Sequence, residues 1–303
     1  MGTALVTGAY GFLGRHVAKF LAEQGYLVTG IGHGVWPDSK SVKWGISRFL
    51  NSDVSYEHLL ACDCRPNLLV HCAGSGSVGA SFVQPHQELL RNVVTASAIF
   101  EYVREVVPRC KVVFPSSAAV YGIASCIPIA ENSLLQPISP YGYNKLYCEQ
   151  LAAYYSKYFG ISTAIVRLFS IYGVGLQKQL FWDACQKLVH GDSTFHGTGE
   201  ETRDWLHVSD AVRLMYLAAK NASPNCMLIN AGSGVGTRVK DALTLIARKF
   251  GVHSLRFLGV QRRGDPTDYQ ADIRLARALG WAPQIGLEKG LSEFVDAFQG
   301  TSL

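Results

Sequence analysis

The sequence predicts an α/β fold, with a doubly wound parallel sheet and a smaller C-terminal lobe. Apolar runs of strand length alternate with segments of helical period over the first half of the chain. The apolar runs are continuous, which is typical of strands buried on both faces of a parallel sheet. Strands that alternate with helices require right-handed crossovers, and these put helices on both faces of the sheet.

The first half contains the elements of that sheet in order. A strand at 4–7 leads through a glycine-rich turn into a helix at 12–23, and an apolar run at 26–31 is the second strand. Further apolar runs predict strands at 68–73, 112–114 and 162–166. One long helix with a proline near its start is expected at 83–106. Another starts at Pro140 and ends near 159, because proline favours the first turn of a helix.

The second half is less regular. Helices are expected near 180–189, 209–220, 239–250 and 287–298. We find no internal repeat and no linker rich in proline or serine, so the second half is predicted to pack as a lobe. The predicted boundary separates a first domain, 1–170, from a lobe, 171–303, some segments of which return to the first domain.

Composition narrows the class of protein. The chain has 303 residues, of which 48% are apolar and 17% charged, and its net charge is +5. These values are ordinary for a globular protein. No block of Lys and Arg exceeds two residues, so neither nucleic acid nor a membrane surface is expected as a partner. With no leader-like segment and no apolar run of bilayer length, the expected location is the cytoplasm.

Eight cysteines are scattered along the chain, several of them in apolar runs. The one close pair, Cys62 and Cys64, has no second pair or histidine at zinc-site spacing, so no metal site is predicted. We expect reduced, buried thiols throughout.

The glycine-rich turn after the first strand predicts a dinucleotide site of the Rossmann type. Gly8 permits the tight turn, Gly11 lets backbone N–H groups approach a pyrophosphate, and Gly14 lets the helix pack closely on the sheet. A glycine-rich turn without a ligand is the alternative, but its place between a first strand and a first helix favours binding. The predicted cofactor contacts from this turn are Gly8, Tyr10, Gly11, Phe12, Leu13 and Gly14.

The end of the second strand bears on which dinucleotide is bound. Residues 30–34 contain no Asp or Glu to accept from the adenosine ribose hydroxyls. Without a carboxylate there, nothing repels the 2′-phosphate of NADP, so the sequence slightly favours NADP over NAD. His33, Arg15 or Lys40 could then donate to that phosphate. Alternatively, His33 is a turn residue and the cofactor is NAD.

A second group of residues suggests acid–base chemistry. Tyr141 and Lys145 are one turn apart on the helix that starts at Pro140, with Ser139 as its cap. A free tyrosine phenol is protonated near neutral pH and so cannot readily accept a proton, but a neighbouring ammonium favours its ionised form. Ser116 and Ser117 end a buried strand, at the edge where open parallel sheets bind ligands.

Together with further motifs, these residues resemble the extended short-chain dehydrogenases/reductases of the NAD-dependent epimerase/dehydratase family, which act on nucleotide-diphosphate sugars. The resemblance covers nearly the whole length. Its other motifs are Leu69-Val70-His71-Cys72-Ala73-Gly74, Asn92, Ser116-Ser117-Ala118-Ala119-Val120-Tyr121-Gly122, Arg167-Leu168-Phe169-Ser170-Ile171-Tyr172-Gly173, Arg203-Asp204-Trp205-Leu206-His207-Val208-Ser209-Asp210, Arg262-Arg263-Gly264-Asp265, Ala271-Asp272-Ile273 and Leu279-Gly280-Trp281-Ala282-Pro283.

The resemblance implies roles for individual residues. Ser117, Tyr141 and Lys145 would be the catalytic triad, with Tyr141 moving the proton of a sugar hydroxyl and Lys145 holding the nicotinamide ribose. Besides the glycine turn, the implied cofactor contacts are His33, Cys72, Ala73, Gly74, Asn92, Ser116, Tyr141 and Lys145. The implied substrate contacts are Ser117, Ser170, Phe195, His196, Arg203, Arg262 and Tyr269.

Some of these assignments have open alternatives. Arg203 and Arg262 fall where the family contacts the nucleotide diphosphate, and paired guanidiniums match phosphate oxygens, but either could form a surface ion pair with Asp204 or Asp265. Ser170 replaces the family's usual Asn. Tyr269 lies where related epimerases limit the room beside the sugar, or it packs within the lobe.

The family resemblance implies a nucleotide-diphosphate-sugar epimerase that works at C4 through a transient 4-keto sugar. Ala118 and Ala119 replace the acid pair of the family's dehydratases, which argues against that activity. The alternatives are an NADPH-dependent 4-keto-6-deoxy nucleotide-sugar reductase and, less favoured, a non-catalytic cofactor-binding scaffold. A homodimer is expected through the helices at 83–106 and 141–159, where Leu89, Leu90, Val93 and Ile99 face a partner or line the sheet.

Overall fold

A computed structural model describes residues 2–36, 38–260, 264 and 266–301. The chain forms two compact units, each assembled from three segments. Unit 1 comprises Met1–Gly122, Leu135–Leu168 and Val212–Ile229. Unit 2 comprises Ile123–Leu134, Phe169–Ala211 and Asn230–Leu303.

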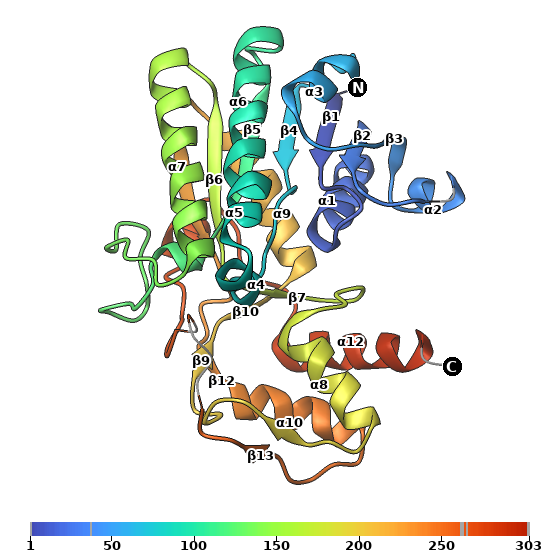
Figure 1. The fold of residues 1–303 in the computed structure, drawn as a ribbon, viewed down its shortest axis with the longest axis vertical. Coiled ribbons are helices and arrows are strands. Elements are labelled where there is room, and N and C mark those ends of the chain that lie inside the picture. Colours follow the sequence, from blue (N-terminus) through green and yellow to red (C-terminus); the bar gives the residue numbers. More distant parts are fainter. Residues whose placement is uncertain (1, 37, 261–263, 265, 302–303) are drawn as a thin grey trace. The chain divides into compact units, whose positions relative to one another are not determined.

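Unit 1 is built on a seven-stranded sheet, which confirms the predicted fold class (Figure 1). The five pairings that join β1 to β6 are all parallel. The strand order along the sheet is β3 (Ile46–Asn51), β2 (Tyr26–Gly32), β1 (Gly2–Thr7), β4 (Leu68–His71), β5 (Lys111–Ser117), β6 (Thr163–Leu168) and β11 (Met227–Ala231). The chain adds β2 and β3 on one side of β1 and then β4, β5 and β6 on the other side. The place between β1 and β4 is therefore a topological switch point, which is where doubly wound sheets bind ligands.

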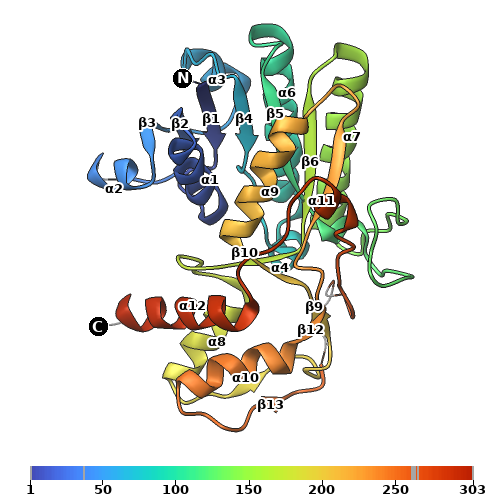
Figure 2. The same cartoon turned by 180° about the vertical axis from the view of Figure 1, so that it is seen from behind.

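Helices cover both faces of this sheet (Figures 1 and 2). On one face, Leu69 of β4 joins a core that includes Ile99 and Phe100 of α6 (Thr95–Val106), and α6 lies beside α7 (Pro140–Phe159). On the other face, Leu68 and Val70 of β4 line a small cavity with residues of α1 (Phe12–Glu23) and α9 (Val208–Asn221). Because neighbouring strand residues point to opposite faces, burial on both explains the continuous apolar runs.

The single helix expected at 83–106 is interrupted in the structure. It is split into α5 (Pro85–Leu89), a π-helical turn η1 (Leu90–Val94) and α6, preceded by the separate α4 (Val78–Val83). Gln84 leaves the helical region at φ −132° and ψ 61°, because the ring of the following proline disfavours a helical conformation there. The π turn has no sequence signature that we recognised.

Several short elements of unit 1 were not predicted. Strand β3 lies at the sheet edge, and its exposed Ser47 and Arg48 interrupt the apolar run by which inner strands are recognised. Helices α2 (Asp38–Lys43) and α3 (Tyr56–Ala61) have six residues each, too few for a clear helical period. The 3-10 turn η2 (Ala118–Val120) follows β5 directly.

The helices expected in the second half of the chain are confirmed. Most of α9 belongs to unit 1. Unit 2 contains α8 (Gln179–Val189), α10 (Val239–Lys249) and α12 (Leu287–Thr301), and a short α11 (Arg274–Ala278) that was not expected. Its described strands form three small pairs: β7 (Ser170–Tyr172) with β10 (Trp205–His207), β9 (Thr202–Arg203) with β12 (Thr237–Arg238), and β8 (Thr194–Phe195) with β13 (Arg256–Phe257).

A buried carboxylate organises the loops of unit 2. Asp204 has no exposed surface, and it accepts hydrogen bonds from the backbone N–H groups of Ser233, Gly234 and Ala271 at 2.5, 2.9 and 2.9 Å. Burial raises the pKa of Asp204, and these donors oppose that shift. The carboxylate thereby fixes both loops beside Arg203.

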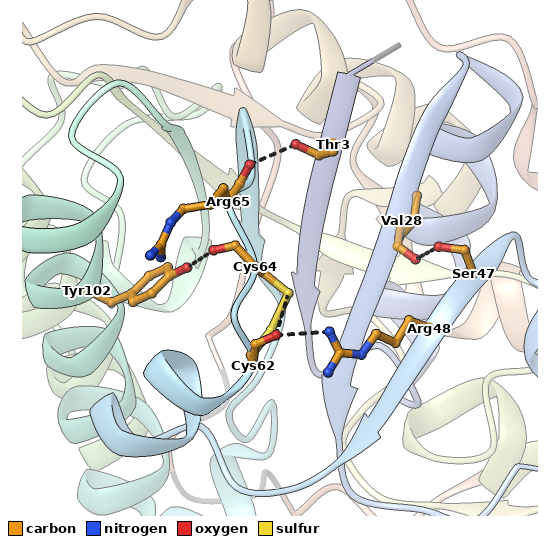
Figure 3. The surroundings of a disulfide bond; sticks show 8 residues. All are labelled: Thr3, Val28, Ser47, Arg48, Cys62, Cys64, Arg65 and Tyr102. Carbon is orange, nitrogen blue, oxygen red and sulfur yellow. Dashed lines mark hydrogen bonds between the residues drawn. A yellow bond between two sulfur atoms is a disulfide. The ribbon is translucent and has the colours of Figure 1, made fainter.

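Cys62 and Cys64 form a disulfide in the loop before β4, so the expectation of reduced thiols is wrong for this pair (Figure 3). The backbone carbonyl of Cys62 accepts from Arg48 at 3.0 Å, and that of Cys64 accepts from the Tyr102 hydroxyl. A loop of three residues is short, so the chain-entropy model gives the bond only roughly 1.5 kcal/mol of stability.

The other six cysteines are free. Cys110, Cys148 and Cys185 are buried as expected, whereas Cys126 is exposed. Among the described residues, no helix is both long enough and apolar enough to cross a membrane.

Candidate active site

The glycine turn lies directly after β1, at the switch point of the sheet. Gly8 adopts φ +65°, and a Cβ there would meet the backbone of Cys72 and Ala73 at 2.6 Å. A Cβ on Gly14 would lie 2.2 Å from the Gly8 carbonyl oxygen. Both positions therefore require glycine, because the turn packs directly against the loop after β4 and against the first turn of α1.

Helix α1 begins at the end of this turn without a side-chain cap. Gly11 is its N-cap residue and has no side chain that could accept from the first-turn N–H groups. Such N–H groups attract an anion, as expected for a pyrophosphate site. Of the other predicted contacts in the turn, Phe12 and Leu13 are half-buried and the Tyr10 ring packs 5.0 Å from that of Trp36.

The end of β2 does have a carboxylate beside it, supplied by a different segment. Asp53, just after β3, lies with Oδ1 2.7 Å from Nε2 of His33, and both side chains are largely exposed. Sequence reasoning missed Asp53 because it missed β3. The predicted phosphate donors are not free: His33 faces this acid, and the Arg15 guanidinium donates to the carbonyls of Tyr10 and Gly11 at 3.0 and 3.2 Å. The side chain of Lys40 is outside the described part of the chain.

His71 joins the carboxyl ends of β1 and β4 and packs against the middle of β5. Its Nδ1 forms a 2.8 Å hydrogen bond with the Thr7 hydroxyl, and its ring stacks on Phe114. The Thr7 hydroxyl also accepts from the N–H of Ala73 at 3.3 Å. Burial, with a smaller effect of Lys145, lowers the pKa of His71 to about 3, so the ring is neutral.

The predicted cofactor residues after β4 lie beside the π turn. A Cβ on Gly74, which has φ +126°, would meet Oδ1 of Asn92 at 2.8 Å. Asn92 is 2% exposed, and its Nδ2 donates to the Glu88 carbonyl at 2.8 Å. Its Oδ1 has no hydrogen-bond partner among the described residues, which is unusual for a buried polar atom and favours a missing donor from a ligand. Burial raises the pKa of the Cys72 thiol to about 12, so it is not a thiolate.

The predicted catalytic pair lies in the first two turns of α7. The Ser139 hydroxyl caps this helix by accepting from the N–H of Gly142 at 3.1 Å, and Pro140 occupies the first turn. Tyr141 and Lys145 are each 8% exposed, and Nζ of Lys145 lies 5.9 Å from the centre of the Tyr141 ring. The two side chains therefore lie close together on one face of the helix.

Lys145 also connects α7 to the end of β5. Its ammonium donates to the Pro115 carbonyl at 3.1 Å, just before Ser116 and Ser117. A Cβ on Gly142 would lie 2.6 Å from the Ala119 carbonyl oxygen, so the first turn of α7 packs directly against η2. Ser117 is half-buried, and its hydroxyl accepts from the N–H of Ala119 at 3.2 Å. The three predicted catalytic residues thus come from two segments in direct contact.

Sequence reasoning missed a buried ion pair behind these residues. Glu149 of α7 and Arg167 of β6 are 5% and 2% exposed, and two guanidinium N–H groups bind the carboxylate at 2.7 and 3.0 Å. The Ser116 hydroxyl donates to the same carboxylate. One signal was available: Glu149 follows Tyr141 and Lys145 at steps of four on one helix face.

In unit 2 the predicted substrate residues have varied surroundings. Arg203 is half-buried and donates to the Thr202 carbonyl at 2.9 Å. Phe195 is 4% exposed, with its ring 6.2 Å from Phe257, so it lies in the interior of the unit, while His196 is exposed. Tyr269 is buried, with its ring 5.9 Å from that of Phe169.

Two predicted residues remain in unit 2. The N–H of Ser170 donates to the Asp204 carbonyl at 2.9 Å as part of the β7 pairing. Arg262 lies outside the described residues, as do Arg263 and Asp265 of the same motif.

Comparison with known proteins gives the family. The model of the NAD dependent epimerase/dehydratase family matches residues 4–232. The chain belongs to this family. A UDP-glucose 4-epimerase of Streptomyces lividans is 29% identical to it over 305 residues, which cover 93% of this chain and 92% of the relative.

Solved structures of similar proteins agree with that membership. MoeE5 in complex with UDP-glucuronic acid and NAD has a TM-score of 0.89 at 29% identity, covering 99% of this chain and 100% of the other. The UDP-glucose 4-epimerase of Thermotoga maritima, in complex with UDP-glucose, has a TM-score of 0.89 at 26% identity, with the same coverage. The family fold thus extends over both units.

Proposed function

We propose that this member of the epimerase/dehydratase family is a nucleotide-diphosphate-sugar 4-epimerase. The observation that carries the proposal is the buried pair of Tyr141 and Lys145. The Lys145 ammonium binds the end of β5, close to Ser117 in the sequence. The similar proteins named above support the reaction, because both epimerases among them act on UDP-glucose at C4.

The residues suit a dinucleotide cofactor. The uncapped first turn of α1 and the Oδ1 of Asn92, which has no hydrogen-bond partner among the described residues, are features that a bound dinucleotide would explain. A bound NAD would supply the hydride acceptor, and in its reduced form the hydride donor, for the sugar carbon. Residues 1–170, together with the returning segment 212–229, are the proposed dinucleotide-binding domain. The rest of 171–303 is the proposed nucleotide-sugar lobe, in which Arg203 is a proposed contact of the diphosphate.

Tyr141, Lys145 and Ser117 would move the proton. The Tyr141 phenolate accepts the proton of the C4 hydroxyl, and the phenol gives it back to the C4 oxygen after the keto sugar has turned. The Lys145 ammonium stabilises the phenolate, and the Ser117 hydroxyl donates to the same sugar oxygen. Ala118 and Ala119 supply no acid or base, so we do not propose elimination of water.

A turnover assay tests this function. The purified chain, without added cofactor, is given UDP-glucose or UDP-glucuronic acid, and the products are separated by chromatography while retained dinucleotide is identified by mass spectrometry. We expect interconversion of the C4 epimers without net formation of NADH. No turnover of either sugar, together with stoichiometric oxidation of NADPH by a 4-keto sugar, would instead establish the reductase.

We further propose NAD as the cofactor. Asp53 puts a negative charge beside the end of β2, where the 2′-phosphate of NADP would lie, and His33 is already paired with it. MoeE5 was solved with NAD in two complexes, which supports the same choice. The slight preference for NADP thereby loses its basis, and the reductase alternative, which uses NADPH, loses the support that this preference gave it.

Replacing Asp53 with Asn should raise affinity for NADP relative to NAD about fivefold, since interactions between exposed charges are worth up to roughly 1 kcal/mol. Titration of the cofactor-free protein with each dinucleotide, followed by tryptophan fluorescence, measures the ratio. Asp63→Asn is the control, because Asp63 is an exposed acid that precedes β4, at the amino ends of the strands, whereas Asp53 follows the carboxyl end of β3. A wild-type protein that binds NADP more tightly than NAD would contradict the proposal.

We also propose that two copies of the chain associate through α5, η1 and α7. Exposed apolar or aromatic side chains gather on these elements: Leu89, Leu90, Val94, Tyr143, Tyr147 and Tyr154. Of the residues expected to face a partner, Ile99 is fully buried and Val93 packs into the core, which leaves Leu89 and Leu90.

The double variant Leu90→Glu/Tyr147→Glu should convert a dimer to a monomer, because it buries two carboxylates in the contact. Light scattering coupled to gel filtration measures the mass. The control is Val42→Glu on α2, which changes an exposed apolar residue away from the proposed contact. A wild-type mass of one chain would overturn the proposal.

The proposed location is the cytoplasm, because the proposed nucleotide sugar and dinucleotide are both charged and do not cross a bilayer unaided.

A further inference from the structure

We propose that Glu149, clamped by Arg167, is a positioning residue that sets the end of β5 against the catalytic face of α7. The inference rests on the proposed epimerase function. It concerns residues that are not among the predicted sugar or cofactor contacts but that bind the segments carrying Ser117 and Lys145.

One carboxylate connects three elements. Glu149 projects from α7, and its oxygens accept from Nε and a terminal N–H of Arg167 on β6 at 3.0 and 2.7 Å and from the Ser116 hydroxyl on β5. Ser116 and Arg167 are direct partners in the β5–β6 pairing, so they lie side by side under the helix. The other arm of Arg167 donates to the Tyr121 hydroxyl at 2.9 Å, just after η2.

Glu149 shares a helix face with the predicted catalytic residues, and it binds β5 one residue further along than Lys145 does. Along α7, Tyr141, Lys145 and Glu149 follow at steps of four and therefore share a face. Along β5, Lys145 binds the Pro115 carbonyl and Glu149 binds the next residue, Ser116, immediately before Ser117. A shift of α7 along β5 would break both contacts, so together they fix the distance between the Tyr141 phenol and the Ser117 hydroxyl.

Stability alone is a poor explanation for such a pair. Burying two charges costs several kcal/mol each, and well-packed apolar residues of similar volume are often as stable or more so. The bidentate geometry does supply orientation, because two parallel hydrogen bonds fix the plane of the carboxylate. Geometry at this point matters for rate, since misplacement by 1 Å costs about a hundredfold.

The test separates position from stability with two variants. In Glu149→Gln, the amide N–H₂ opposes a donor of Arg167, and the buried guanidinium loses its counter-charge. In Glu149→Leu/Arg167→Met, both charges are gone and the core is apolar. We expect kcat for UDP-glucose to fall about ten- to hundredfold in both, with KM and NAD affinity within about threefold, although the double variant regains the melting temperature that Glu149→Gln loses.

The control is Glu101→Gln. Glu101 is likewise held by two N–H groups of Arg104, at 2.6 and 3.0 Å, and by the Tyr155 hydroxyl at 3.0 Å, but it lies on α6, away from the end of β5. Its kcat should equal that of the wild type. Recovery of kcat together with melting temperature in the double variant, or an equal loss in Glu101→Gln, would overturn the proposal.

Crystal structures of the wild type and Glu149→Gln provide a readout that needs no turnover. We expect the Ser117 hydroxyl to move by about 1 Å relative to Tyr141 in the variant. If the wild type turned over no UDP-sugar, the epimerase proposal would fail, and this displacement alone would decide the positioning role. An unmoved Ser117 in a well-ordered variant would overturn that role.

Discussion

Replacing Tyr141 with Phe should lower kcat for epimerisation by about a thousandfold while leaving NAD bound. The substitution removes one hydroxyl, which is the only group on this residue that can carry the proton, and general acid–base catalysis contributes about 10²–10⁴. The aromatic ring keeps its place in the buried first turn of α7, so stability should change little. Steady-state kinetics with UDP-glucose and a count of retained NAD by mass spectrometry measure both effects.

Tyr143→Phe is the matched control for this experiment. Tyr143 lies two residues further along α7 and is 47% exposed, so its hydroxyl points away from the face of Lys145. Its kcat should remain within about twofold of wild type, as for most surface substitutions. Full activity in Tyr141→Phe would remove this phenol from the mechanism, and the absence of any activity in the wild type would favour the non-catalytic scaffold.

Replacing Gly14 with Ala should abolish high-affinity dinucleotide binding and lower the free energy of unfolding by about 3 kcal/mol. The new Cβ would lie 2.2 Å from the Gly8 carbonyl oxygen and 2.9 Å from Cα of Ala9. Both neighbours are backbone atoms of the turn, so no side chain can rotate away. Relief requires α1 to move off the turn, which removes its N–H groups from the expected pyrophosphate.

Gly79→Ala in α4 provides the comparison, because a Cβ there would meet no described atom within 4 Å beyond its own stretch of helix. Alanine is the better helix former, so this variant should gain about 0.5–1 kcal/mol. Denaturant unfolding and NAD titration of both variants separate crowding of the turn from the general effect of adding a methyl group. Wild-type NAD affinity in Gly14→Ala would mean that the turn does not hold the pyrophosphate.

The sheet was predictable because its inner strands are buried on both faces and therefore leave continuous apolar runs. The edge strand β3 leaves no such run, since Ser47 and Arg48 face solvent, and Asp53 was missed along with it. Glycine positions were predictable for a similar reason: a backbone approach of 2.2 Å at Gly14 tolerates no other residue.

Features that depend on tertiary contact were not predictable in this way. The Glu149–Arg167 pair joins a helix to a strand, and neither residue type in isolation indicates burial. The π turn at 90–94 and the disulfide between Cys62 and Cys64 likewise have no period or spacing that distinguishes them from an ordinary helix and two free thiols. The same limit applies to Phe195, whose aromatic character fits a ligand contact and a buried core position equally well.

The threading of the chain through its two units has a consequence for synthesis on the ribosome. Unit 1 can fold completely only after residues 212–229 have left the ribosome, because this last segment supplies the α9 residues that cover Leu68 and Val70. A nascent chain of 170 residues would display that apolar face to water. Expression of the first 170 residues alone should therefore give an insoluble product, and a minimal cofactor-binding fragment must extend to about residue 230.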